Sequence, residues 1–196
     1  MKSNKMVTTI AALTASFFLA GTAVAAGKGK NPGPTSIYDI ANTTPGFELL
    51  TDLVDVAGLA DTLTFDGQFT VFAPTNDAFP FDTVEEGVAF LAGACSVDVN
   101  DENLGYIVGV LTNVLLHHVR DGRRFSGSIL NGSGPKSLEM LNGYIWVDDD
   151  LSIMTGSGGE SSINGGLFDV NASNGVIHAI TAVMLPKDVC VVPDAG

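Results

Sequence analysis

The chain has little positive charge. Its 196 residues include nine lysines and arginines against 22 aspartates and glutamates, which gives a formal net charge of −13. An acidic surface of this kind repels nucleic acid and anionic lipid, and no stretch is basic enough to follow a phosphate backbone. The composition therefore excludes nucleic acid as a partner.

Long apolar runs are scarce too, and the one at the N-terminus is short. It follows two lysines and ends in Ala23-Val24-Ala25, the small-x-small pattern of a cleavage site. A membrane-spanning helix needs about 20 apolar residues, more than this run contains. We therefore predict that residues 1–26 are a secretory signal peptide, cleaved near Ala25/Ala26. The mature protein is expected to be periplasmic or extracellular, with no membrane span.

Cysteine is also rare, with two in the chain. In an exported protein an even count favours a disulfide, and Cys95–Cys190 is the one pairing that two cysteines allow. Two buried or free thiols are the alternative. The bond would close a loop of about 95 residues and would fasten the tail after Pro186 to the segment around Cys95.

The residues that follow the signal peptide are predicted to form one domain. Residues 27–35 are rich in glycine, proline and lysine and are predicted to be a flexible lead-in, with the domain at 36–186 and a tail at 187–196. Helical spacing of apolar residues predicts helices near 47–57, 82–91 and 103–118. Strand candidates follow at 136–141, 144–147, 151–154, 167–170 and 176–185, with turns at Asn142-Gly143 and Asn174-Gly175. Helices before strands predict an α+β fold with a largely antiparallel or mixed sheet.

The run FTVFAPTNDAF, residues 69–79, combines a strand, a stop and a helix start. Apolar and β-branched residues predict the strand, and Pro74 ends it because proline has no N–H to donate to a sheet. Thr75 or Asn76 is predicted to cap a helix, with Asp77 in its first turn. Thr75 and Asp77 are thus expected to have local structural roles.

Three blocks of the chain, in this order, point to a family: TVFAPTNDAF (70–79), NVLLHHVRDG (113–122) and NGVIHAITAVMLP (174–186). They resemble the signature blocks of the fasciclin domain family, and the chain is similar to secreted bacterial proteins with a single such domain. The resemblance implies a β-sandwich or wedge of mixed short strands with helices packed alongside. It also implies a secreted module for cell adhesion and matrix contact that binds an extracellular protein, a polysaccharide or a cell-surface component, without catalysis, metal or cofactor.

The second block departs from the family pattern, which has Tyr-His where this chain has His117-His118. In animal members the Tyr-His pair is implicated in integrin binding. His118 lies on the apolar face of its helix and is predicted to be a buried, hydrogen-bonded residue. His117 is rotated by about 100° and is predicted to be exposed. Adjacent helical histidines do not share a face, so no metal site is expected. His178, in the closing strand, is predicted to be a packed structural residue.

Our leading functional hypothesis is adhesion to a matrix or cell-surface partner. The predicted contact region comprises His117, His118, Arg120, Arg123 and Arg124, because these three arginines cluster on an otherwise acidic chain. The alternative is that the arginines belong to a connecting turn and that their charges only keep this turn solvated. A second hypothesis is a carrier or sensor of a small, lipid-like apolar ligand outside the cytoplasm. Because no G-x-S-x-G elbow or other catalytic motif is present, no enzymatic activity is predicted.

Overall fold

The computed structural model describes residues 34–65, 67–130, 134–163 and 166–191. The predicted signal peptide with its cleavage site, most of the lead-in and the last five residues lie outside these ranges. No helix within them is long and apolar enough to cross a membrane.

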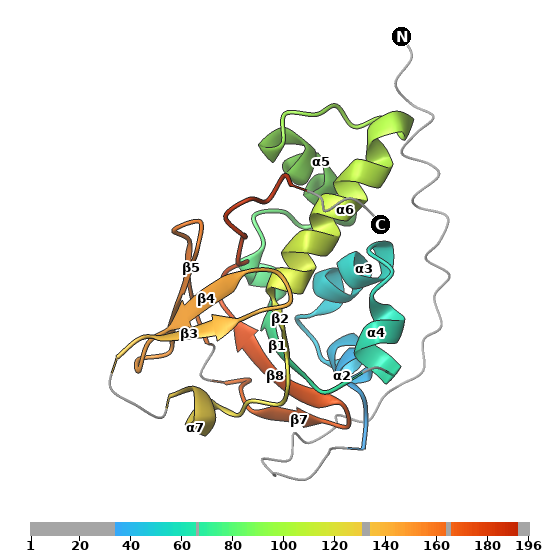
Figure 1. The fold of residues 1–196 in the computed structure, drawn as a ribbon. Coiled ribbons are helices and arrows are strands. Elements are labelled where there is room, and N and C mark those ends of the chain that lie inside the picture. Colours follow the sequence, from blue (N-terminus) through green and yellow to red (C-terminus); the bar gives the residue numbers. More distant parts are fainter. Residues whose placement is uncertain (1–33, 66, 131–133, 164–165, 192–196) are drawn as a thin grey trace.

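The described chain begins with helices and continues with short strands (Figure 1). The elements are α2 (Ile37–Thr43), α3 (Glu48–Val56), α4 (Ala60–Phe65), β1 (Phe69–Pro74), the 3₁₀ turn η2 (Asn76–Ala78), α5 (Val84–Ala94), α6 (Asp101–His117), β2 (Val119–Asp121), α7 (Ser126–Ile129), β3 (Lys136–Glu139), β4 (Tyr144–Val147), β5 (Ser152–Thr155), β6 (Glu160–Ser162), β7 (Val170–Ala172) and β8 (Gly175–Ile180).

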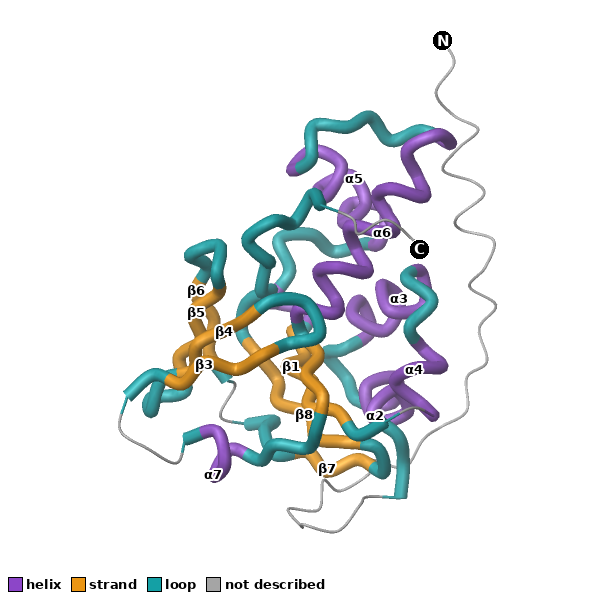
Figure 2. Tube along the Cα trace, viewed as in Figure 1, coloured by secondary structure: helices purple, strands orange, loops and turns teal. Residues whose placement is uncertain are grey.

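The strands form two four-stranded sheets, ordered β2-β1-β8-β7 and β3-β4-β5-β6. The pair β1–β8 is parallel, while the other strand pairs of both sheets are antiparallel. Helices α2 to α6 lie on one side of the first sheet, and the second sheet lies on the other side (Figure 2). The predicted α+β class with a mixed sheet is confirmed.

The three blocks singled out in the sequence come together in space. The first contributes β1, the second contributes β2 and the third contributes β8, so they form three adjacent strands of one sheet. Gly175, at the start of β8, lies so close to β1 that a Cβ atom there would be 2.2 Å from the carbonyl oxygen of Phe69. Only glycine allows the two strands to approach in this way.

Strand β1 is buried on both faces because it lies between two apolar cores. Phe69, Val71 and Ala73 face a cluster formed with helices α2 to α6. Phe72 faces the other way, into a second cluster that includes Ile145 of β4. Burial on both faces explains why this strand is almost entirely apolar.

The predicted helix after β1 is wrong, because only one 3₁₀ turn, η2, is present there. The Thr75 side chain makes no capping hydrogen bond, while Asp77 lies in the first turn of η2, as predicted. Asn76 does cap a helix, but a different one. Its Oδ1 accepts from the N–H of Leu49 at 3.2 Å, in the first turn of α3, where Phe47 at the cap position has no polar side chain.

The predicted disulfide between Cys95 and Cys190 is present, with the two Cα atoms 5.4 Å apart. It joins the end of α5 to the C-terminal segment. Two hydrogen bonds from α6 hold the same segment: Tyr106 donates to the carbonyl of Cys190 and Asn113 donates to the carbonyl of Val191, each at 2.6 Å.

Replacing both cysteines by serine is expected to lower the free energy of unfolding by about 2–5 kcal/mol, because a bond that closes a loop of 95 residues strongly restricts the unfolded chain. Urea unfolding followed by circular dichroism measures this difference. A reductant should lower the midpoint of the wild type and leave that of the double variant unchanged. Equal midpoints for the oxidised wild type and the double variant would contradict the prediction.

Candidate functional site

His118 is the C-cap residue that follows helix α6, and it is buried, as predicted. Its Nδ1 lies 2.7 Å from the carbonyl oxygen of Val114, and its Nε2 lies 2.9 Å from the backbone nitrogen of Met184. A carbonyl only accepts and an N–H only donates, so the ring is neutral with its proton on Nδ1. Burial lowers the pKa of His118 to about 4.

His117 is buried as well, with 1 % of its surface exposed, so the prediction that it is exposed is wrong. The turn between β3 and β4 covers its ring. Nδ1 of His117 donates to the carbonyl of Asn142, and Gly143, at φ +85°, is so close that a Cβ there would lie 3.3 Å from Nδ1. Burial lowers the pKa of His117. Neither member of the His117-His118 pair is available to a partner.

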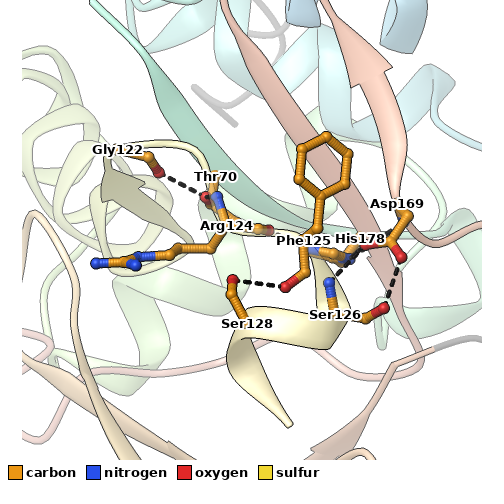
Figure 3. A network of polar contacts seen from close by, with 8 residues as sticks. All are labelled: Thr70, Gly122, Arg124, Phe125, Ser126, Ser128, Asp169 and His178. Carbon is orange, nitrogen blue, oxygen red and sulfur yellow. Dashed lines mark hydrogen bonds and ion pairs between the residues drawn. The ribbon is translucent and has the colours of Figure 1, made fainter. Parts of the chain in front are cut away.

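His178 is fully buried in β8 and belongs to a polar network, which Figure 3 shows. Its Nε2 donates to the carbonyl of Arg124 at 2.8 Å, and its Nδ1 accepts from the N–H of Asp169 at 3.3 Å. The Asp169 carboxylate accepts two hydrogen bonds from Ser126, from its N–H at 2.6 Å and its hydroxyl at 2.5 Å. The packed, structural role predicted for His178 fits these contacts, and burial lowers the pKa of the ring.

The serine, histidine and aspartate of this network do not form a catalytic triad. The Ser126 hydroxyl donates to Asp169 and not to His178, whereas a nucleophile must be bonded to its base. The ring of His178 is also inaccessible to a substrate. The network instead ties α7 and the turn before β7 to the first sheet (Figure 3).

The three arginines of the predicted contact region have different surroundings. Arg123 donates to the side chains of Gln68 and Asn171 and to the carbonyls of Ala172 and Ser173. Its guanidinium thereby ties the start of β1 to the β7–β8 turn.

Arg120 is half-buried, and its Nη1 donates to the carbonyl of Glu139 at 3.0 Å. Arg124 is exposed, and Figure 3 shows its side chain pointing away from the polar network. Of the five residues predicted to contact a partner, Arg124 is therefore the one with an exposed side chain.

An apolar cavity of about 180 Å³ lies between the η2–α5 segment, helix α6 and the segment after β8. Phe79, Phe81 and Phe90 form one wall, with ring centroids of consecutive pairs 5.3 and 5.8 Å apart. His118 also lines the cavity, and both of its nitrogens are hydrogen-bonded elsewhere. The cavity is therefore suited to apolar groups rather than to polar ones. The sequence analysis did not identify this cavity, and the two aromatic residues of Phe79-Pro80-Phe81 are the sequence signal that could have indicated it.

Metal binding has no support in this part of the molecule. Across the described ranges, no group of three or more histidine, cysteine, aspartate or glutamate side chains is placed to hold an ion. Each of the three buried histidines has one ring nitrogen bonded to a backbone carbonyl.

The free energy of unfolding is expected to fall as the pH falls from about 6.5 to about 4. The unfolded chain takes up a proton at His118 in this window and the folded chain does not, a difference on the order of 3 kcal/mol. His118→Gln keeps an N–H for Val114 and an oxygen for Met184 without titrating. Urea unfolding at several pH values should therefore show a weaker pH dependence for His118→Gln. The same dependence in both proteins would contradict the prediction.

Comparison of the sequence with known proteins gives a family and several relatives. The model of the fasciclin domain matches residues 45–186. Protein sll1483 of Synechocystis sp. is 32 % identical over 157 residues, which cover 77 % of this chain and 73 % of that protein. Transforming growth factor-beta-induced protein ig-h3 of Sus scrofa is 28 % identical, covering 79 % of this chain. Periostin of Homo sapiens is 28 % identical, covering 80 %. The chain spans only 20 % of ig-h3 and 17 % of periostin.

Among solved structures, a FAS1 domain pair from the insect cell adhesion molecule fasciclin I has a similar fold. The TM-score is 0.52 at 14 % sequence identity, with 81 % of this chain and 53 % of the other covered. This likeness supports the fold, and the sequence match extends over most of the described residues. The chain therefore belongs to the fasciclin domain family.

Proposed function

We propose that this protein is a secreted adhesion module that binds a matrix or cell-surface partner outside the cytoplasm. The observation that carries the proposal is the fasciclin domain at residues 45–186, whose fold recurs in an insect cell adhesion molecule. Secretion rests on the predicted signal peptide. The module itself is taken to be residues 36–186, with 187–196 as its tail.

The geometry narrows the region through which such a partner would bind. His117 and His118 are buried, and the guanidinium of Arg123 is bonded within the fold. A contact in the second block would therefore depend mainly on the exposed Arg124. The turn that carries it is held firmly, because the Arg124 N–H donates to Thr70 Oγ1 at 2.8 Å and its carbonyl accepts from His178.

Beads coated with oxidised residues 27–196 should be retained on at least one member of a panel of matrix polymers and cell surfaces. Beads coated with the urea-denatured chain, which carries the same charge, are the control. Retention equal to that of the denatured chain would contradict the adhesion function.

The variant Arg124→Glu tests the second block separately. It should lower bead retention, whereas Lys187→Glu, the same charge reversal at another exposed position, should not. If the two variants behave alike, Arg124 is not a contact residue.

A second candidate function, the carriage of a small apolar ligand, is favoured by the cavity beside His118. Its volume of about 180 Å³ is similar to that of an engineered apolar cavity of about 150 Å³ that binds benzene. An uncharged ring or the end of an acyl chain fits a space of this size and chemistry.

Benzene titrated into the protein should cause saturable shifts in the ring-proton NMR signals of the phenylalanines around the cavity. Ala78 lines the same space and is only partly buried, so Ala78→Leu should fill part of it without breaking a hydrogen bond. The shifts are expected to be lost in this variant. Shifts that do not saturate, or that persist in Ala78→Leu, would contradict ligand binding in the cavity.

A further inference from the structure

Large apolar side chains cover the outer face of the second sheet. Tyr144 is 51 % exposed, Trp146 39 % and Met154 49 %, while Ile145, between the first two on β4, is fully buried. We call the surface formed by Tyr144, Trp146 and Met154 the aromatic face. The sheet that carries it lies at the left of Figures 1 and 2, away from helices α2 to α6.

The strand register brings acidic side chains next to these rings. Trp146 is paired with Met154 on β5, and Met154 is paired with Glu160 on β6. Tyr144 is paired with Glu139 on β3. Directly paired residues of neighbouring strands share a face of the sheet and lie about 5 Å apart. Both glutamates are exposed, so a group seated on Trp146 lies within about 10 Å of two carboxylates.

Three cations lie near the aromatic face, and one of them, Lys187, is exposed beside Gly156 in the β5–β6 turn. Arg120 donates to the backbone carbonyl of Glu139 at the sheet edge. Lys136 is paired with the buried Val147, and its neighbour Ser137 is exposed. Lys136 therefore belongs to the buried face of β3, opposite to the aromatic face. The turn between β4 and β5 adds the three carboxylates of residues 148–150. The five carboxylates of Glu139, Glu160 and residues 148–150 outnumber the three cations, so the field over this face is negative.

We propose that the aromatic face binds a basic segment of a partner protein, one that presents arginine or lysine side chains. A cation over a tryptophan or tyrosine ring is attracted by the ring, and Glu139 and Glu160 are placed to pair with neighbouring cations. The proposal rests on the proposed function only in taking the partner to be a surface or matrix component.

Charge also argues against other occupants. A second copy of this chain would bring its own net charge of −13 and the same glutamates against the face. An anionic polymer meets the same repulsion. A neutral polymer would leave the carboxylates without a partner, whereas a basic segment pairs with them.

The test measures fluorescence anisotropy with a labelled ten-residue peptide that alternates arginine and glycine. Peptides of the same length with glutamate or serine in place of arginine are the controls. The arginine peptide should bind the oxidised wild type, and its affinity should fall as NaCl is raised from about 50 to about 500 mM. Trp146 is the one tryptophan of the chain, so its intrinsic emission reports contact at the face directly.

Trp146→Leu should lower the affinity for the arginine peptide about fivefold. Trp146→Phe, which keeps a ring, should lower this affinity less. The double variant Glu139→Gln with Glu160→Gln should lower the affinity for the arginine peptide about threefold and reduce its dependence on salt. Asp61→Asn with Asp98→Asn removes the same charge at exposed positions on other elements and should leave the affinity unchanged. Urea midpoints near that of the wild type show that each variant is folded.

Equal binding of the peptide by the wild type and by folded Trp146→Leu overturns the inference, as does equal binding of the glutamate or serine peptide. The bead assay separates this outcome from failure of the adhesion function. Full adhesion by folded Trp146→Leu overturns the aromatic face as the partner surface and leaves the function standing. Peptide binding that depends on Trp146, in a protein that adheres to nothing, supports the inference and contradicts the function.

Discussion

The parallel pairing of β1 with β8 is the contact on which the rest of the structure depends. It joins strands more than 100 residues apart along six paired positions, from Phe69–Gly175 to Pro74–Ile180. Helices cover one face of this pair and the second sheet covers the other, so both apolar cores are built on it. The pairing requires glycine at 175, because any side chain there would meet the backbone of β1.

Features encoded by neighbouring residues could be predicted from the sequence. The periodicity of α6, the strand before Pro74 and the hairpin turn at Asn142-Gly143 are local signals, and the structure has each of them. The two cysteines allowed one pairing, and it is present. The resemblance to fasciclin domains supplied the overall architecture, which spacing alone did not give beyond α+β.

Features set by distant contacts were missed. The burial of His117 could not be predicted, because the turn that covers its ring is 25 residues away in the sequence. Asn76 looked like a cap for its own segment and caps α3 instead, 27 residues back. The alternation Tyr-Ile-Trp-Val predicted the strand at 144–147 but not which of its faces would stay uncovered. The surroundings of Arg123 were missed for the same reason, because its acceptors are Gln68, before β1, and residues of β7 and the turn after it.

The disulfide also determines how the molecule would respond to a pull on its ends. Residues between Cys95 and Cys190 lie inside a covalent ring, which includes α6, β2, the whole second sheet and β8. The covalent path of such a pull runs from α5 through the sulfur atoms, so residues 95–190 cannot be drawn out into an extended chain while the disulfide is intact. β1 lies outside the ring but pairs with β2 and β8 inside it, so the segment before Cys95 can extend only after these strand pairs separate. Oxidation therefore limits the length to which the molecule can be stretched, while the pairings of β1 bear part of the load.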